Sequence, residues 1–162
     1  STLRVETFRS PDLGILGYVD EDKVAFYRAT TKRHTVNSEF DLGNIQQLPR
    51  VEIVYSSQAS SATAITALIE GGVRGIVFAG SGSGSLSSEY QATLRSVPPA
   101  RRPALVRSSR VGSGRVIPRK EFEPLGMIAG DNLNPQKARI LLMLALTKTT
   151  DVGEIQRFFD EY

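Results

Sequence analysis

A short loop at positions 78–90, FAGSGSGSLSSEY, carries the residues best suited to chemistry, because three glycines alternate there with three serines. Glycine lets the backbone approach a ligand closely, and serine hydroxyls donate and accept hydrogen bonds. The loop follows the apolar run GIVFAG, and ligands of parallel α/β sheets bind beyond the carboxyl ends of strands. The pattern is consistent with a ligand-binding loop and also with a flexible turn that binds nothing.

The two common phosphate-binding motifs are absent from this loop. A Walker loop needs a lysine followed by serine or threonine, and the loop contains no lysine. A dinucleotide loop needs GxGxxG and an acidic residue about 20 positions later. Here Gly80, Gly82 and Gly84 give GxGxG, and the later segment is PPARRP, without an acid. If the loop binds a ligand, its serine hydroxyls are therefore expected to contact a different kind of ligand, and the turn that binds nothing stays the alternative.

The composition excludes several other function classes. The chain has no cysteine, so disulfides and thiolate metal sites are excluded. Its one histidine, His34, lies in the polar stretch TTKRHTVNSEF, so we expect a surface histidine rather than part of a catalytic triad. Seven Lys or Arg and no acid occupy positions 101–120. Without interleaved aromatic residues this run does not indicate nucleic-acid binding. No apolar run reaches the roughly 20 residues of a membrane helix.

From residue 51 onward, the pattern predicts alternating strands and helices. Strands are expected at 51–56, 75–80, 103–109 and 125–130, and helices at 60–70, 86–97, 134–149 and 151–162. Ser60 or Ser61 is expected to cap the first helix, Asn134 the third and Asp151 the last. Nearly continuous apolar strands such as GIVFAG are typical of parallel sheets covered on both faces. We predict an α/β fold, a small parallel-sheet, flavodoxin-like, three-layer domain.

The first fifty residues do not resemble the start of such a domain. Two β-prone runs, 14–20 and 23–29, flank the acidic turn Asp20–Asp22, which predicts a β-hairpin. An isolated hairpin is marginal in water and needs a partner sheet. Residues 30–50 are polar with scattered apolar anchors, as in an ordered linker. We divide the chain into a hairpin (1–31), a linker (32–50) and an α/β domain (51–162).

Four stretches, taken in chain order, resemble the carboxyl half of bacterial type II L-asparaginases, and most closely the glutaminase–asparaginase branch. They are SPDLGILGYV (10–19), IVFAGSGSGSLS (76–87), RSSRVGSG (107–114) and DNLNPQKARILLMLALTKT (131–149). The family enzyme has two α/β domains, and its threonine nucleophile lies in a TGGT-type segment of the larger, amino-terminal domain. This chain contains neither that segment nor an HGTDT-type stretch. The resemblance implies the smaller domain, preceded by its linker and by the last hairpin of a missing larger domain.

The resemblance also implies where a substrate would bind. In the family, the smaller domain completes a neighbouring subunit's active site with a polar residue of the glycine-rich loop and with a carboxylate. Matching the loop residue by residue assigns substrate contact to Ser85, with Ser83 as a second candidate. Glu121, seven residues past Gly114, corresponds to the carboxylate that binds the substrate ammonium group. The segment after Glu121 is two residues shorter than the family pattern, so Glu123 is the alternative.

The implied activity is hydrolysis of the side-chain amide of L-asparagine, and of L-glutamine, to the acid and ammonia. No cofactor or metal is implied, and the chain alone is expected to be inactive. Its expected partners are the missing amino-terminal domain and further copies in a dimer of dimers, with neither nucleic acid nor membrane. Periplasmic residence is implied, with the cytoplasm as the alternative.

Arg107 and Arg110 are expected to be structural or interface groups. Two other functions stay open: a non-catalytic module that binds a small anion, and a pure assembly domain.

Overall fold

The computed structural model describes residues 3–10 and 12–162, so Pro11 of the SPDLG motif lies outside the described residues. The strands and α-helices are β1 Gly17–Asp20, β2 Lys23–Phe26, β3 Val51–Tyr55, α1 Thr63–Glu70, β4 Gly75–Gly80, α2 Ser88–Ser96, β5 Ala104–Ser109, β6 Met127–Ala129, α3 Pro135–Ala145 and α4 Val152–Glu161. Short 3-10 helices are η1 Val5–Thr7, η2 Thr35–Asn37, η3 Leu42–Asn44, η4 Pro99–Arg101 and η5 Lys120–Leu125. The predicted α/β class is confirmed.

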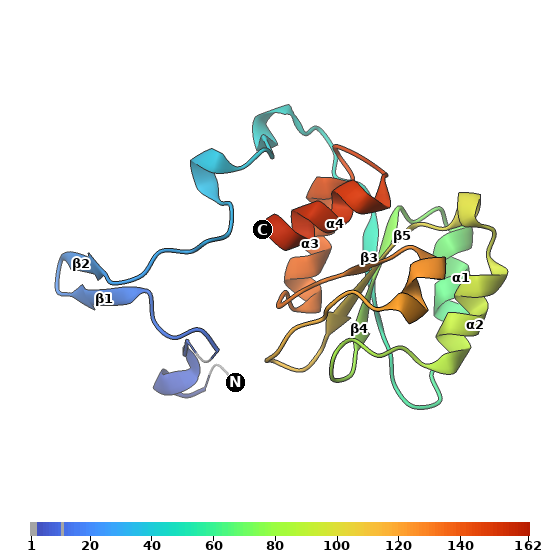
Figure 1. Cartoon of the computed structure of the whole chain (residues 1–162), viewed down its shortest axis with the longest axis horizontal. Helices are drawn as coiled ribbons and strands as arrows, with labels where there is room; N and C mark the ends of the chain where they lie inside the picture. Colours follow the sequence, from blue (N-terminus) through green and yellow to red (C-terminus); the bar gives the residue numbers. More distant parts are fainter. Residues whose placement is uncertain (1–2, 11) are drawn as a thin grey trace.

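The domain has three layers around a parallel sheet of four strands in the order β3-β4-β5-β6. Each crossover moves one strand in the same direction, so right-handed connections place α1, α2 and η5 on one face. Helices α3 and α4 cover the other face (Figure 1). Strand β4 is buried along its whole length, which explains the unbroken apolar run GIVFAG. The predicted three-layer arrangement is confirmed.

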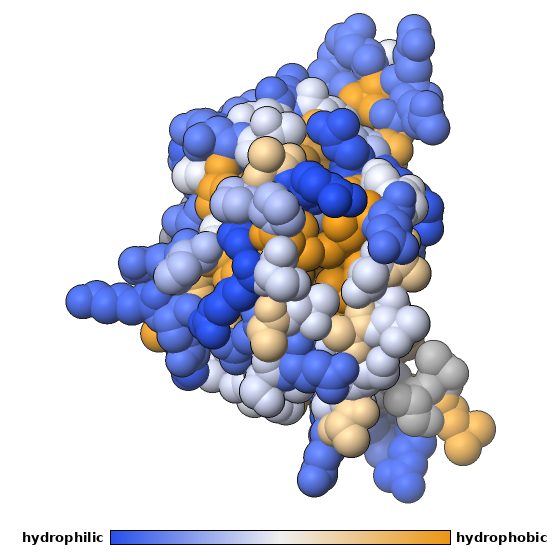
Figure 2. Space-filling view, turned by 90° about the vertical axis from the view of Figure 1, so that its right-hand side faces the viewer, coloured by the Kyte–Doolittle hydropathy of each residue, from blue (hydrophilic) through white to orange (hydrophobic). Residues whose placement is uncertain are grey.

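Alternate residues of the strands enter two separate cores. Ile76 and Phe78 of β4 pack toward α1 and α2, whereas Val77 packs toward α3 and α4. Phe158 and Phe159 of α4 close the second core. The face over α1 and α2 turns toward the viewer in Figure 2, where it is mostly hydrophilic with a small apolar area near its centre. Because the four strands are parallel, their carboxyl ends all lie at the same edge of the sheet between these two cores.

The strands follow one another across the sheet in chain order. Doubly wound sheets reverse their strand order, and the reversal opens a crevice that holds the ligand. No such reversal occurs in the four-stranded sheet described here. A ligand site at the carboxyl edge must therefore be built from the connecting loops.

The start of α1 and the end of α3 differ most from the predicted helix boundaries. The N-cap position of α1 is Ala62, so neither Ser60 nor Ser61 occupies it. Ser61 nevertheless satisfies a helix amide, because its Oγ accepts from the Thr63 amide at 3.2 Å. A tertiary contact satisfies the neighbouring amide, since the Ala62 amide donates to Glu89 Oε1 in α2 at 2.9 Å. Helix α3 ends at Ala145, before the predicted residue 149. The other capping predictions are confirmed, since the Asn134 and Asp151 side chains accept from the amides three residues on.

The predicted hairpin is confirmed, and it extends away from the α/β body (Figure 1). Strands β1 and β2 are antiparallel, with Tyr18 opposite Ala25. Apolar side chains of the hairpin are exposed, including Val19 at 72% and Phe26 at 74%. A two-stranded ribbon with so little burial is not stable by itself in water. Its apolar surface is therefore suited to a sheet outside the described residues.

The segment between hairpin and sheet packs on α4. The Phe40 ring lies 4.9 Å from the Phe158 ring and 5.1 Å from the Tyr162 ring, measured between centroids. The Glu39 carboxylate accepts from Arg157 Nη1 and Nη2 at 3.0 and 3.1 Å. These contacts attach the segment to the α/β domain. His34, in the same segment, is exposed, as predicted.

We expect Glu39→Gln to lower the free energy of unfolding by about 1 kcal/mol at neutral pH, because the ion pair is only partly buried. The hydrogen bond from Arg157 holds the pKa of Glu39 below its ordinary value of 4.5. The contribution is therefore present above that ordinary value and is lost as the pH falls through the lower pKa of the folded state. Urea unfolding at neutral and acid pH measures the difference.

Glu52→Gln is the matched control, because Glu52 pairs with Arg50 on a more exposed surface. Its effect should stay within about 0.5 kcal/mol at both pH values. Equal effects of the two substitutions would contradict the attachment of this segment through Glu39.

Candidate functional site

The Gly/Ser loop, residues 80–85, leaves the carboxyl end of β4 and turns back within a few residues. Ser81 and Ser85 form an antiparallel bridge, and the amides of Gly84 and Ser85 both donate to the Ser81 carbonyl at 3.0 Å. The φ angles are +50° at Gly82 and +79° at Gly84, in the left-handed region that disfavours residues with a Cβ atom. The loop is a defined tight turn.

Close packing explains two of the three glycines. A Cβ atom on Gly80 would lie 2.6 Å from the Ser85 carbonyl oxygen, and one on Gly84 would lie 2.8 Å from Val116 Cγ1. A Cβ atom on Gly82 would meet nothing within 4 Å, so this glycine is required by its backbone conformation alone. The Gly/Ser loop therefore lies directly against Val116, and this contact determines its position.

The segment that follows Val116 carries the candidate carboxylates. Val116 exchanges backbone hydrogen bonds with Asp131 at 2.9 and 3.1 Å. The chain then enters η5, which buries Phe122 and leaves Glu121 and Glu123 exposed on either side of it. The burial of Phe122 thus fixes the backbone from which both carboxylates extend.

Arg119 connects the loop with one of these carboxylates. Its Nη2 donates to Ser83 Oγ at 2.7 Å, and its Nη1 lies 3.6 Å from Glu121 Oε1. Ser83 and Glu121, both selected from the sequence, are therefore brought together by a guanidinium that the sequence analysis did not select. The sequence feature that could have indicated Arg119 is its place two positions before Glu121, but it lies in a run with six other Lys or Arg residues.

The other two candidates have fewer contacts. Ser85 is exposed just past Gly84, and among the described residues its hydroxyl has no hydrogen-bond partner. The Glu123 backbone carbonyl accepts from the Gly126 amide at 2.9 Å, but in the described chain no side-chain contact joins Glu123 to the Gly/Ser loop. Neither Ser85 nor Glu121 lines any of five hollows on the surface of the described residues. The candidate site is thus an exposed edge, open to a second polypeptide.

A buried arginine supports this edge from below. Arg107 is 1% exposed, its Nη2 donates to the Ile117 carbonyl, and its guanidinium lies 4.1 Å from the centroid of the Phe122 ring. Burial lowers the pKa of Arg107 to about 10, and the nearby charge of Arg119 acts in the same direction, whereas Glu121 raises the pKa. Within the described chain, Nε and Nη1 have no hydrogen-bond partner. Arg107 therefore anchors the segment 117–122 at an electrostatic cost.

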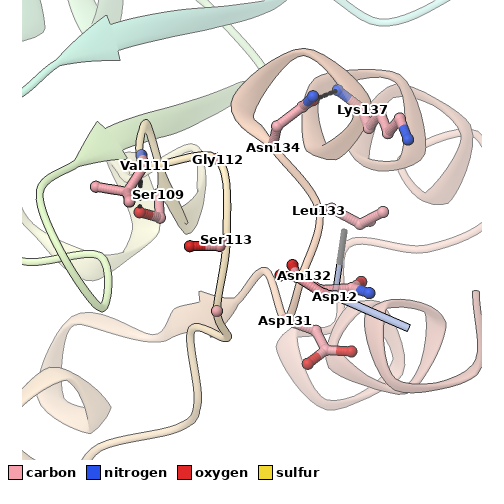
Figure 3. Close-up of a pocket in the computed structure, with 11 residues that line it drawn as sticks. Asp12, Ser109, Val111, Gly112, Ser113, Asp131, Asn132, Leu133, Asn134 and Lys137 are labelled. Atoms are coloured by element: carbon pink, nitrogen blue, oxygen red, sulfur yellow. Dashed lines mark hydrogen bonds between the residues drawn. The ribbon is translucent and has the colours of Figure 1, made fainter. Parts of the chain in front are cut away.

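A small cavity lies near this edge but does not include the candidate residues. It has a volume of about 170 Å³ and opens between the loop after β5 and the loop before α3 (Figure 3). The Asn134 side chain accepts from the Lys137 amide, and the Asp131 carboxylate pairs with Arg115 and Lys32. These polar groups are already engaged with the protein.

Two further classes of site find no support in the described residues. No group of three or more His, Asp or Glu side chains is arranged to hold a metal ion among them. In residues 3–10 and 12–162, no helix has the length and apolarity needed to cross a membrane.

Gly84→Ala should destabilise the chain by about 2–4 kcal/mol, because the left-handed backbone and the clash with Val116 both oppose a Cβ atom. Gly82→Ala is the matched control, since it introduces the same backbone strain into open space and should cost only about 1–2 kcal/mol. Chemical denaturation of both variants measures the difference. Equal losses would show that the contact with Val116 does not determine the position of the loop.

Arg107→Ala should lower the free energy of unfolding by about 3–5 kcal/mol, because it leaves a cavity beneath Phe122. Arg107→Met fills most of that volume and removes a buried charge, so it should stay within about 1 kcal/mol of the wild-type chain. Thermal unfolding followed by circular dichroism compares the two variants. A loss with Met as large as with Ala would assign the role to the charge instead of the volume.

Comparison with known proteins identifies relatives along the whole chain. Residues 50–159 match the family described as Glutaminase/Asparaginase C-terminal domain. The chain is 40% identical to L-asparaginase 2 of Bacillus subtilis over 162 residues, which are 100% of this chain and 43% of that protein. It is 43% identical to the glutaminase-asparaginase of Pseudomonas fluorescens biotype A, covering 99% of this chain and 44% of that protein.

A solved structure shows the same relation. The crystal structure of the "Probable Cytoplasmic L-asparaginase" from Campylobacter jejuni superposes with a TM-score of 0.92 at 45% identity. The match covers 100% of this chain and 53% of that chain. The present chain therefore spans about half the length of the relatives that it matches.

Proposed function

The chain belongs to the Glutaminase/Asparaginase C-terminal domain family, and on that premise we propose that it supplies one half of an amidohydrolase active site. The complete enzyme hydrolyses the side-chain amide of L-asparagine, and of L-glutamine, to the acid and ammonia. The observation that carries the proposal is the meeting of Ser83 and Glu121 on the guanidinium of Arg119. A hydroxyl and a carboxylate at one exposed edge suit an amino-acid substrate held against a second polypeptide.

In this proposal, the chain binds and positions the substrate. The Glu121 carboxylate accepts charge-assisted hydrogen bonds from the substrate ammonium group, and the Ser85 hydroxyl contacts the substrate beside it. The nucleophile is a threonine of the amino-terminal domain, which forms an acyl-enzyme that water then hydrolyses. The chain itself contains no TGGT-type segment. In this proposal, the residue that attacks the amide bond therefore lies outside this chain.

The exposed hairpin supports the proposed domain organisation. Its apolar side chains, Val19 and Phe26 among them, are mostly exposed, as expected for the last hairpin of a larger sheet. We accordingly assign 1–31 to the larger domain, 32–50 to the linker and 51–162 to the smaller domain. Association into a dimer of dimers belongs to the same proposal, because the half-site needs a neighbouring subunit's nucleophile.

Glutamine hydrolysis follows from the small side chain of Ser85. A serine at this position leaves room for the extra methylene of glutamine, whereas the asparagine of strict asparaginases fills more of the pocket. One methylene is worth only about 1–3 kcal/mol in such a pocket. We therefore propose comparable use of the two amides.

The cellular compartment of the protein is also a proposal. A relative from Haemophilus influenzae, 38% identical, is named periplasmic, and the solved structure from Campylobacter jejuni is named cytoplasmic. We propose the periplasm. Cell fractionation of the native organism, with detection by an antibody to this chain, distinguishes the two compartments.

The isolated chain should release no ammonia from asparagine, and turnover should appear when the amino-terminal domain is supplied on the same or a separate polypeptide. A coupled ammonia assay measures both states. Turnover by the isolated chain that is lost on Ser85→Ala would contradict the proposed division of labour. Calorimetric binding of phosphate to the isolated chain would favour the anion-binding module instead.

In the complete enzyme, Glu121→Gln should raise KM for asparagine about 10-fold to 100-fold, because a hydrogen bond to a charged group is worth about 1.5–3 kcal/mol. Glu123→Gln is the matched control, since Glu123 lies two residues away in the same 3-10 helix η5 and is also exposed to solvent. Its KM should change less than about twofold. The reverse order of the two effects would assign the carboxylate role to Glu123.

A further inference from the structure

We propose that Arg119 is a positioning residue of the half-site, which holds the Glu121 carboxylate beside the Gly/Ser loop so that Glu121 can bind the substrate ammonium group. This inference rests on the proposed function. It goes further by naming a residue of this chain on which the carboxylate depends. Arg119 acts through Glu121 and has no contact of its own with the substrate in this scheme.

The geometry of Arg119 suits a clamp between two segments. Nη2 contacts Ser83 Oγ at 2.7 Å, while Nη1 of the same guanidinium lies 3.6 Å from Glu121 Oε1. The planar guanidinium presents its donors in a rigid fork, so one contact constrains the other. A lysine ammonium is a compact point charge on a flexible stem and does not reproduce this spacing.

Glu121 needs such a partner because little else restrains it. Its side chain is 56% exposed, and within the described residues Arg119 is the one side chain that forms an ion pair with it. An unrestrained glutamate loses up to about 1.5–2 kcal/mol of rotamer entropy when it is fixed. The contact with Arg119 reduces that loss before the substrate arrives. It engages Oε1, and a carboxylate has a second oxygen that can accept from the ligand.

The base of the clamp is itself fixed. The Arg119 carbonyl accepts from the Phe122 amide at 3.0 Å, and Phe122 is buried beneath the guanidinium of Arg107. On the other side, Ser83 belongs to the loop that packs against Val116 through Gly84. Arg119 therefore spans two segments whose backbones are both anchored, so its loss should release the Glu121 side chain without unfolding either segment.

The test compares Arg119→Gln, Arg119→Lys and the wild-type complete enzyme on three amides. Asparagine carries both an ammonium group and an α-carboxylate. 3-Aminopropanamide lacks the carboxylate, and succinamic acid lacks the ammonium group. Arg110→Gln is the control, because Arg110 is an exposed arginine of the same basic run and also lies near the loop, its amide donating to the Gly80 carbonyl at 2.9 Å.

We expect Arg119→Gln to raise KM about fivefold to 20-fold for asparagine and 3-aminopropanamide, and less than about twofold for succinamic acid. The kcat should change little, and Arg119→Lys should restore only part of the loss. In a Glu121→Gln background, Arg119→Gln should add no further increase, because the two residues act as one unit. Arg110→Gln should match the wild type on all three substrates.

Three results would overturn the inference. A KM increase confined to asparagine and succinamic acid would mean that Arg119 binds the α-carboxylate directly. Equal losses on all three substrates, with a lower unfolding temperature, would mean a purely structural role. Unchanged kinetics would mean no role. If the wild-type complete enzyme hydrolyses asparagine and one of these three results is found, only the role of Arg119 is refuted. If the wild-type complete enzyme does not hydrolyse asparagine, the proposed function is refuted as well.

Discussion

The close contact between Gly84 and Val116 is the constraint on which the candidate site depends. A Cβ atom at position 84 would lie 2.8 Å from the valine, so only glycine allows the loop after β4 to lie directly on the segment after β5. That contact places Ser83 within reach of Arg119, and Arg119 within reach of Glu121. The alternating glycines therefore serve packing and backbone conformation, while the serines between them remain at the surface for hydrogen bonding. A loop rich in glycine is here a hydrogen-bonded turn packed against its neighbour.

The same edge of the sheet carries a local cost in stability. Arg107 is buried with two nitrogens that have no partner in the described chain, and burial of an incompletely paired charge is unfavourable. Its stacking on Phe122 and its hydrogen bond to the Ile117 carbonyl offset part of that cost. Departures from ideal packing of this kind concentrate at functional sites. The arrangement is consistent with an edge shaped for binding more than for stability.

The fold leaves the candidate site open at the surface of this chain. The four parallel strands follow one another without a reversal, so the sheet opens no crevice between diverging loops, and its candidate residues lie on an exposed edge. The hairpin β1–β2 extends from the opposite end of the linker with its apolar side chains exposed. Both features are those of a unit that completes its surfaces against other polypeptide, in agreement with relatives about twice as long.

The sequence by itself determined the class of fold, the hairpin, the four strands, and the caps at Asn134 and Asp151, because these depend on hydrophobic periodicity and on contacts between residues close in the chain. Through its resemblance to a known family, it also pointed to Ser85 and Glu121, with Ser83 and Glu123 as the alternatives. Only the tertiary structure decided that Arg119 joins Ser83 to Glu121, and that Glu89 of a neighbouring helix accepts from the Ala62 amide at the start of α1. The contacts of Arg119 with Ser83 and of Glu89 with Ala62 join segments that are distant in the sequence. These contacts form because the strands bring separate loops together in space. A local pattern of residues does not show which loops will meet.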